Sequence, residues 1–185
     1  IAPIQVVIVP IYKSEKNLKD IKKYLAYTCK YCDQNDISYY FDDREKLSPG
    51  YKFNEWEMKG IPIRIEIGLR DMDNNNLTFV RRDTLEKKVV KIKDFTKTIP
   101  SELKDIQNNL FTEALNFQQK NTFTVASYDK FKKLINRGAF IECGWDGTSK
   151  TEQKIKEETN ATIRCIPLDS DSSRLKCIYS SKKAK

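Results

Sequence analysis

The sequence predicts an α/β protein: a mixed five-stranded sheet with flanking helices over residues 1–100, followed by a small α+β domain over residues 101–185. Three observations lead to this prediction. Residues 4–9 form a short, nearly continuous apolar run between two prolines, which is typical of a strand covered on both faces. From residue 61 to residue 67, isoleucines alternate with other residues, which is the period of a β-strand. The predicted order in the first hundred residues, β-α-β-α-β-β-β, places crossover helices between parallel strands and ends in a hairpin.

The first helix is predicted to follow the first strand. Asn17 and Asp20 have the spacing of a capping box, which marks the start of a helix. Apolar residues then recur at spacings of three and four: Leu18, Ile21, Leu25, Cys29 and Cys32. This spacing places them on one face of a helix, so we expect that face to pack against the sheet.

A second strand is predicted at residues 37–41, and a polar loop, residues 42–50, follows it. A short helix is then expected over residues 51–59. Phe53 and Trp56 stand at helical spacing, and we expect them to pack this helix on the sheet.

The alternating strand at residues 61–67 should turn its isoleucines inward. Arg64 and Glu66 fall on the opposite face, so the strand is predicted to be half-buried with its charges in solvent. Residues 77–82 and 87–92 then form a predicted hairpin.

A domain boundary is predicted near residue 100, at residues 98–101. A long amphipathic helix follows, with one apolar face: Leu103, Ile106, Leu110, Ala114 and Phe117. The remaining predicted elements are helices at residues 127–136 and 149–158 and short strands at residues 122–126, 140–143, 161–168 and 176–179.

The composition indicates a folded, soluble protein. Hydrophobic residues make up 39% of the chain and charged residues 32%, with only 6 Gly and 6 Pro, which excludes disordered and collagen-like chains. No apolar run approaches the roughly 18–20 residues of a membrane span, and no secretory signal pattern opens the chain. The formal charge of +8 favours polyanionic partners. Because the chain begins without Met, almost directly inside an apolar strand, we expect it to be a fragment of a longer protein.

The residue inventory excludes most kinds of catalytic site. There is no His, so His-based triads and the commonest metal ligand are excluded, and no Gly-rich phosphate loop is present. We therefore expect no catalytic residue in this chain. Cys29 and Cys32 have redox-motif spacing, but their place late on an apolar helix stripe favours core packing over a redox or metal site. Five cysteines form no convincing disulfide framework, so reduced thiols and a cytoplasmic location are expected.

One long segment carries the clearest functional signal. Residues 43–71 read DREKLSPGYKFNEWEMKGIPIRIEIGLRD, and VRRDT follows at residues 80–84 in the predicted hairpin. This segment closely resembles the anticodon-binding domain of class II aminoacyl-tRNA synthetases, specifically prolyl-tRNA synthetases of the archaeal and eukaryotic kind. The resemblance continues through DIQ at residues 105–107 into the C-terminal domain, more loosely after residue 143. It implies the anticodon-binding fold of that class.

By position in the family motif, four residues are expected to read the two guanines of the proline anticodon: Glu57, Arg64, Arg70 and Asp71. Anticodon bases are unpaired, so they can be splayed onto a protein and read on their Watson–Crick edges. The guanine edge offers two donors and one acceptor, which a carboxylate and a cationic donor satisfy together. Arg82 and Lys87 are expected to add base or phosphate contacts from the hairpin. The alternative is a solvated face of surface ion pairs.

The C-terminal domain departs from the family pattern. Many relatives carry four cysteines there around a zinc ion, and Cys143 and Cys177 match two of those positions. Thr148 and Tyr179 stand where the other two are expected. With two thiolates and no His, we expect no metal site, so packing alone should hold this domain.

The resemblance also implies the setting of this chain. The full enzyme would attach proline to tRNA(Pro) using ATP and Mg²⁺ in an upstream catalytic domain, and would be a homodimer, with no cofactor in this part. It would end in a Tyr, beyond Lys185, where this sequence stops. Two alternatives remain open: a free-standing tRNA- or RNA-binding accessory domain, and the anticodon domain of a related class II synthetase.

Overall fold

The computed structural model describes residues 2–169, 171 and 174–185. The chain divides into two compact units, an N-terminal unit that ends at Thr112 and a C-terminal unit that begins at Glu113. Within the described residues, none of the helices has the length and apolar character that crossing a membrane requires.

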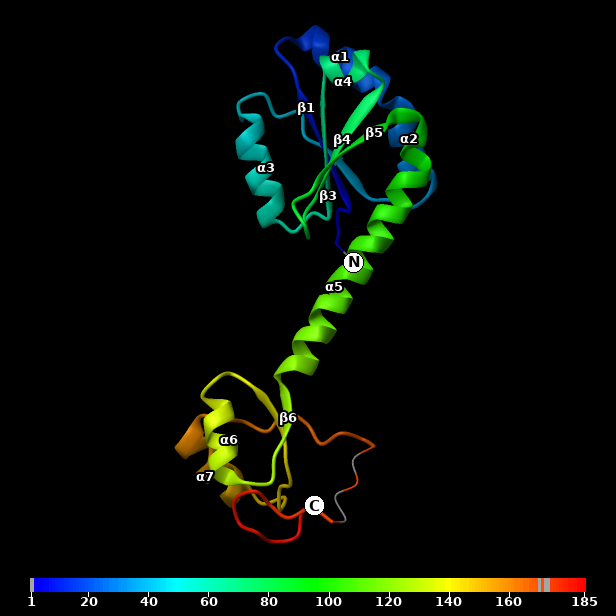
Figure 1. Ribbon diagram of the computed structural model, residues 1–185. Helices are drawn as coiled ribbons and strands as arrows, with labels where there is room; N and C mark the ends of the chain where they lie inside the picture. Colours follow the sequence, from blue (N-terminus) through cyan, green and yellow to red (C-terminus); the bar gives the residue numbers. More distant parts are fainter. Residues whose placement is uncertain (1, 170, 172–173) are drawn as a thin grey trace. The chain divides into compact units, whose positions relative to one another are not determined.

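The N-terminal unit is built on one five-stranded sheet with the order β2-β1-β3-β4-β5 (Figure 1). Its strands are β1 (Val6–Ile11), β2 (Tyr39–Phe41), β3 (Ile63–Gly68), β4 (Asn76–Arg81) and β5 (Lys87–Lys91). β1 runs parallel to β2 and β3, whereas β4 is antiparallel to both β3 and β5. The predicted mixed five-stranded sheet is therefore confirmed.

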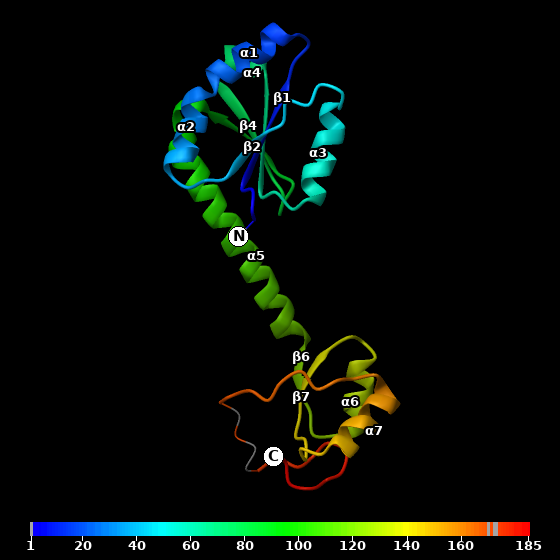
Figure 2. The same ribbon diagram turned by 180° about the vertical axis from the view of Figure 1, so that it is seen from behind.

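Helices cover both faces of this sheet. They are α1 (Glu15–Tyr24), α2 (Ala26–Gln34), α3 (Pro49–Met58), α4 (Leu69–Asp73), a 3₁₀ turn (Ile92–Asp94) and α5 (Phe95–Asn121). α3 lies on one side of the sheet, and α1, α2 and the start of α5 lie on the other (Figures 1 and 2). The unit is thus a three-layer α/β sandwich, and α4 is a short helix that the sequence pattern did not predict.

The first helix begins one turn earlier than predicted. Ser14 is the N-cap of α1, and the Ser14 hydroxyl accepts from the Asn17 backbone N–H at 3.3 Å. The prediction of a capping box at Asn17 and Asp20 is therefore wrong. The helix is also broken at Leu25, where α1 ends and α2 follows. The apolar stripe itself packs as predicted, because all its members except the partly buried Cys29 are buried.

The larger core lies between the sheet and α1, α2 and α5. Its most deeply buried members include Ile8, Ile21, Leu25, Ile63, Ile65, Ile67, Leu77, Phe79, Phe95 and Ile99. A smaller cluster on the opposite face packs Trp56 and Phe53 of α3 against Val7 and Val9, which confirms the packing role predicted for both aromatic residues. Burial of both sheet faces explains the nearly continuous apolar run of β1.

The prediction of a half-buried β3 is wrong. Arg64 is 7% exposed and Glu66 is 8% exposed, because α3 and the β5 side chains cover the face that carries them. Alternation along a strand distinguishes its two faces but does not show that one of them meets solvent. The two charged side chains must therefore find partners inside the protein.

α5 runs without a break through the predicted domain boundary. Pro100 lies inside the helix and has no N–H to donate to the carbonyl of Thr96, one turn earlier. The Tyr31 hydroxyl donates to that carbonyl instead, at 2.9 Å, and so satisfies it. The division of the chain into units therefore comes at Thr112, later than the predicted boundary at residue 100. Of the predicted apolar face, Ile106 is buried and Leu103 partly buried, whereas the later members are exposed.

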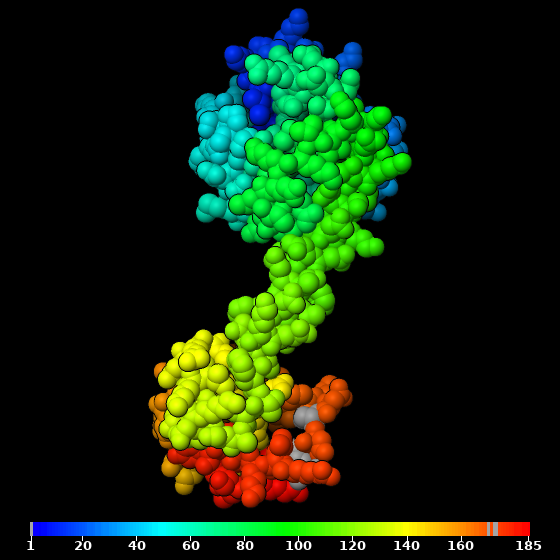
Figure 3. Space-filling model, in the orientation of Figure 1, coloured from blue at the N-terminus to red at the C-terminus, as the bar shows by residue number. Residues whose placement is uncertain are grey.

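The C-terminal unit pairs β6 (Thr122–Thr124) in parallel with β7 (Phe140–Glu142) and packs α6 (Tyr128–Ile135) and α7 (Ser149–Thr159) around a core. That core consists of Val125, Phe131, Ile155 and Ile178 with partly buried neighbours. The last residues of the chain, red in Figure 3, lie against the rest of this unit.

Two predicted strands of the C-terminal unit do not form. Residues 161–168 have no regular secondary structure, and residues 176–179 make only isolated bridges, one of them between Cys177 and Gly144. A Cβ atom at Gly144 would lie 2.3 Å from the Lys176 carbonyl oxygen, so only glycine fits this close approach. The chain therefore joins these segments through single contacts rather than through a sheet.

Candidate nucleic-acid interface

The candidate site lies on the sheet face that α3 covers. The strand register places Val7, Arg64, Val80 and Lys87 directly opposite one another across β1, β3, β4 and β5. Glu57, at the end of α3, lies over this row. The fold thus gathers a carboxylate and two cations that are far apart in the sequence.

Arg64 is the centre of the site. Its Nη1 donates to Glu57 Oε1 at 2.5 Å, and its Nε donates to Glu66 Oε1 at 3.1 Å. The guanidinium carbon lies 4.3 Å from the centre of the Phe53 ring, within the range of a cation–π contact. The side chain is 8% exposed, so its orientation is fixed by these three partners.

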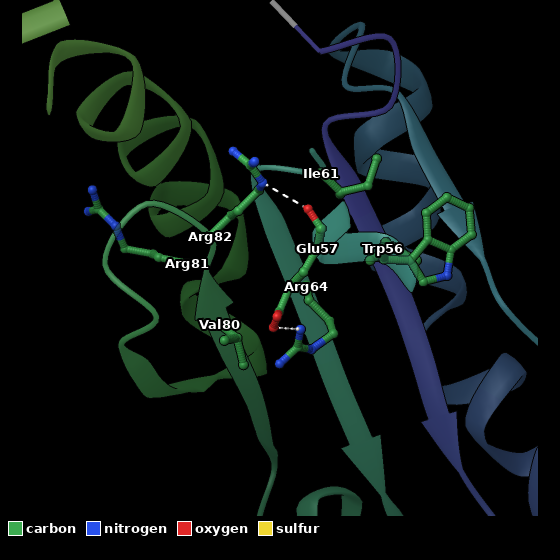
Figure 4. Close-up of a pocket in the computed structure, with 8 residues that line it drawn as sticks. Trp56, Glu57, Ile61, Arg64, Val80, Arg81 and Arg82 are labelled. Atoms are coloured by element: carbon green, nitrogen blue, oxygen red, sulfur yellow. Dashed lines mark hydrogen bonds and ion pairs between the residues drawn. The ribbon is translucent and has the colours of Figure 1, made fainter. Parts of the chain in front are cut away.

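Arg82 and Lys87 complete the group, which we call the Arg64 cluster: Glu57, Arg64, Glu66, Arg82 and Lys87. Arg82 Nε donates to the Glu57 carbonyl oxygen at 3.0 Å, and Lys87 Nζ lies 3.0 Å from Glu66 Oε2. Figure 4 shows Arg64, from β3, and Arg82, just beyond the end of β4, both reaching Glu57. The pocket between them encloses about 10 Å³, room for about one water molecule, so the cluster is filled by its own side chains.

Two further polar groups hold the walls of this site. Asp42 is fully buried, and its carboxylate accepts from Arg44 Nη2 and Trp56 Nε1, both at 2.7 Å, which ties α3 to the end of β2. Burial alone would raise the pKa of Asp42, but these hydrogen bonds and the charge of Lys52 outweigh it and lower the pKa to about 2. Asp42 thus stays ionised at neutral pH and anchors the helix that carries Glu57.

The hairpin end is anchored in a similar way. Arg81 Nη2 lies 2.7 Å from Asp83 Oδ2, and its Nη1 lies 3.1 Å from Glu102 Oε2 on α5. Asn109 of α5 also donates to Asp83, at 2.9 Å. Hydrogen bonds with Asp83 raise the pKa of Arg81, and Arg81 in turn holds the pKa of Asp83 below its usual value. The turn that presents Arg82 is therefore fixed on both sides.

Arg70 and Asp71 lie elsewhere. Both belong to α4, beyond the far end of β3, and Gly68 lies four residue steps beyond Arg64 along the strand, about 13 Å. Asp71 Oδ2 accepts from the Gly68 backbone N–H at 2.8 Å, which caps α4, while Arg70 is exposed. The structure thus brings Glu57, Arg64, Arg82 and Lys87 together and keeps Arg70 and Asp71 apart from them.

Sequence reasoning missed Glu66, Asp42 and the network of Arg81. A signal for Glu66 was present, because opposite charges two residues apart on a strand share one face. No pattern in the sequence indicated that Asp42 is buried, because it belongs to the segment predicted as a polar loop.

The cysteines pack as the sequence suggests. Cys32 is buried and Cys29 partly buried, and burial raises the pKa of both thiols, that of Cys32 to about 12, which opposes a redox role. In the C-terminal unit, burial and the neighbouring Cys177 raise the pKa of Cys143. Within the described residues, no group of three or more His, Cys, Asp or Glu side chains could hold a metal ion. The absence of zinc from this chain stays a prediction.

The side chains at the two positions expected for further zinc ligands, Thr148 and Tyr179, make hydrogen bonds within the fold. The Tyr179 hydroxyl donates to Glu158, away from Thr148. The Ser180 hydroxyl and the Thr148 hydroxyl instead donate to the same residue, Asp146, at 2.6 and 2.9 Å. Hydroxyl groups and a carboxylate therefore meet at this point of the structure.

Comparison with known families decides which kind of fold this is. Residues 5–102 match the family model described as an anticodon binding domain. The chain belongs to the anticodon-binding domain family. Residues 128–185 match a second model, described as the C-terminal region of prolyl-tRNA synthetase.

Known proteins match both regions together. The proline–tRNA ligase of Porphyromonas gingivalis is 45% identical over 182 residues, and that of Cytophaga hutchinsonii is 45% identical over 183 residues; each match covers 98% of this chain and 37% of the relative. The crystal structure of prolyl-tRNA synthetase from Cryptosporidium parvum, complexed with L-proline and AMP, superimposes with a TM-score of 0.82 at 31% identity and covers 99% of this chain and 39% of that one.

The chain thus spans about 37% of the length of these curated relatives. The predicted resemblance to prolyl-tRNA synthetases is confirmed, for the anticodon-binding domain and the C-terminal region. The narrower assignment to the archaeal and eukaryotic kind stays a prediction.

Proposed function

We propose that this chain selects tRNA(Pro) by its anticodon for a longer proline–tRNA ligase. The observation that carries the proposal is the Arg64 cluster, in which a largely buried guanidinium and a partly exposed carboxylate are held side by side in an anticodon-binding fold. A carboxylate and a guanidinium together offer what the Watson–Crick edge of guanine requires.

The contact between Arg64 and Glu57 explains how such a site discriminates. Without RNA, the two side chains satisfy each other beside a pocket that has room for only about one water molecule. A base that enters must take over their hydrogen bonds. Guanine can do so, because its edge both donates and accepts, whereas a base with the wrong pattern leaves a desolvated charge without a partner.

Arg70 and Asp71 supply a second pair of the same chemistry. We assign one guanine to Glu57 and Arg64 and the other to Arg70 and Asp71. The strand length between the pairs requires the two bases to be splayed apart, as bases in single-stranded loops can be. In this assignment, Lys87 and Arg82 contribute base or phosphate contacts beside the first guanine.

The test compares Arg64→Ala with Lys91→Ala. Lys91 is exposed on β5, and its Nζ donates to the Asn74 carbonyl oxygen rather than to a side chain of the Arg64 cluster, so we assign it to phosphate attraction. Binding of the chain is measured for tRNA with the proline anticodon and for single-base variants of it. Arg64→Ala should cost about 1–3 kcal/mol on the cognate tRNA and relax discrimination at one base. Lys91→Ala should weaken all the tRNAs equally.

Arg64→Lys keeps the positive charge but loses the planar fork, so it separates base reading from simple attraction. It should retain folding, checked by circular dichroism, and still lose discrimination. If both Arg64 variants weaken every anticodon variant by the same factor as Lys91→Ala, the strand binds phosphate and the assignment of base readers is wrong.

The activity of the whole protein follows from the same proposal. The longer ligase would use ATP and Mg²⁺ in a catalytic domain outside these residues, act as a homodimer and work in the cytoplasm. This chain alone should therefore release no pyrophosphate in the presence of proline and ATP, and measurable ATP–pyrophosphate exchange by the 185-residue chain would overturn the assignment.

A further inference from the structure

The C-terminal unit contains a second pocket, which the proposed function does not use. It has a volume of about 290 Å³ and lies between the first two turns of α7 and the segment that follows Cys177. Three lysines line it: Lys150 and Lys154 from α7, and Lys182 from the other side.

These lysines are not neutralised within the unit. Lys150 and Lys154 are four residues apart on α7 and share one face. None of the three forms an ion pair with any residue from 2–169, 171 or 174–185. The unit from Glu113 onward carries 14 Lys and Arg against 9 Asp and Glu, an excess of five positive charges in 73 residues. The pocket therefore attracts anions.

Among the described residues that line the pocket, Asp146 is the only carboxylate, and its hydrogen-bonding capacity is used within the fold. It accepts from Ser180 Oγ at 2.6 Å, from Thr148 Oγ1 at 2.9 Å and from Thr151 Oγ1 at 2.9 Å. Hydrogen bonds hold the pKa of Asp146 well below its usual value, and the bond from Ser180 has the largest effect. The carboxylate thus joins the start of α7 to the opposite wall and fixes the pocket's shape.

An aromatic ring lies beside the lysines. Tyr179 lines the pocket, and Lys154 Nζ lies 6.0 Å from its ring centre. The ring is held in place, because its hydroxyl donates to Glu158 at 3.1 Å and its edge meets Tyr128 with ring centres 5.1 Å apart. Lysines interleaved with fixed aromatic rings are typical of surfaces that bind single-stranded nucleic acid.

We propose that this pocket binds the phosphodiester backbone of RNA without regard to sequence. Its volume is large enough for a phosphate group, and it offers three lysines that form no ion pair with any described residue and a ring on which a base or ribose can pack. The identity of that RNA as a tRNA rests on the proposed function, whereas the pocket's affinity for RNA phosphates does not.

The test uses the 185-residue chain and the double variant Lys150→Ala/Lys154→Ala. Its matched control is Lys133→Ala/Lys156→Ala, which removes the same charge from exposed positions of the same unit outside the pocket. Binding to tRNA with the proline anticodon, and to the same tRNA with an altered anticodon, is measured over a range of salt concentrations.

The pocket variant should lose affinity on the order of tenfold at 0.1 M salt, by the same factor for both tRNAs, and its plot of log K against log salt should become shallower by about 1.5. The control variant should change the affinity and the salt slope by only a small fraction of the changes in the pocket variant. Equal losses in the two double variants would mean that net charge alone matters, and would overturn the proposal.

A second arm replaces the tRNA with phosphatidylserine vesicles. If the pocket variant loses binding to vesicles but not to RNA, the pocket binds a membrane surface and the proposal fails. The outcome is separate from that of the anticodon test: a failure of Arg64→Ala to change discrimination would remove the proposed function and leave the salt result of the pocket variant unaffected.

Discussion

Replacing Asp42 by Asn should strongly destabilise the N-terminal unit while leaving its shape almost unchanged. The carboxylate is completely buried and is the anion shared by Arg44 and Lys52. Asn has the same size but no charge. Arg44 would keep Glu55 as a partner, whereas the Lys52 side chain, 3% exposed, would keep the backbone carbonyl oxygen of residue 42 but no carboxylate among the described residues. The variant therefore leaves a buried ammonium group without an anion.

Two independent estimates give the loss of stability expected for Asp42→Asn. Removing one partner of a buried ion pair costs about 3–5 kcal/mol. The pKa of Asp42, about 2 against an ordinary 3.8, corresponds to about 2–3 kcal/mol of stabilisation by the charged form. Because the pKa is depressed in the folded state, this contribution is complete above pH 4 and is lost as the pH falls through 2; about half of it remains at pH 3.

Urea unfolding at pH 7 and pH 3, followed by Trp fluorescence and far-UV circular dichroism, measures both quantities. We expect Asp42→Asn to lose about 3 kcal/mol at pH 7, with an unchanged m-value, and distinctly less at pH 3. The control is Asp43→Asn, whose carboxylate is 43% exposed and pairs with the half-exposed Lys22, and which should cost less than about 1 kcal/mol. A loss at Asp42 no larger than that of the control, or one that is the same at both pH values, would refute this reasoning.

Three further outcomes are expected. Gly144→Ala should destabilise the C-terminal unit by about 1–3 kcal/mol in calorimetry, because the added Cβ would meet the Lys176 carbonyl, and a neutral result would show that the close approach relaxes freely. Cys29 and Cys32 should react with a thiol reagent only after unfolding, whereas the exposed Cys165 should react in the folded chain; fast labelling of Cys29 or Cys32 themselves, located by peptide mapping, would contradict their assignment to the core. The purified chain should carry no stoichiometric zinc; elemental analysis that finds about one zinc per chain would refute this.

Periodicity predicted most of the fold. The alternating isoleucines of β3, the β1 run and the helical stripe in α1 and α2 all pack where the pattern places them. Periodicity missed α4, because five residues are too few to display a helical period. It also predicted a strand at residues 161–168, where apolar composition favours a strand but the fold supplies no neighbour to pair with.

The site was harder to predict than the fold. The family motif named four residues together, Glu57, Arg64, Arg70 and Asp71, yet the strand that runs through the motif separates the last two from Arg64. The burial of Arg64 depends on α3, which no pattern within the strand could reveal. The acceptor Glu66 was read as a solvent-facing charge for the same reason.

The Tyr31 hydroxyl and the Pro100 ring depend on each other, so we expect substitutions at these two positions to occur together. The proline leaves the Thr96 carbonyl without a helical donor, and the tyrosine supplies one from α2. With Ala at position 100 the helix would donate to that carbonyl itself, and the tyrosine hydroxyl would become redundant there. Tyr31→Phe should therefore be costly only while the proline is present, a thermodynamic coupling that a double-mutant cycle measures. Pro100 lies where the sequence predicts a domain boundary. Because it leaves the Thr96 carbonyl free to accept from Tyr31, it instead allows α2 to bind the start of α5.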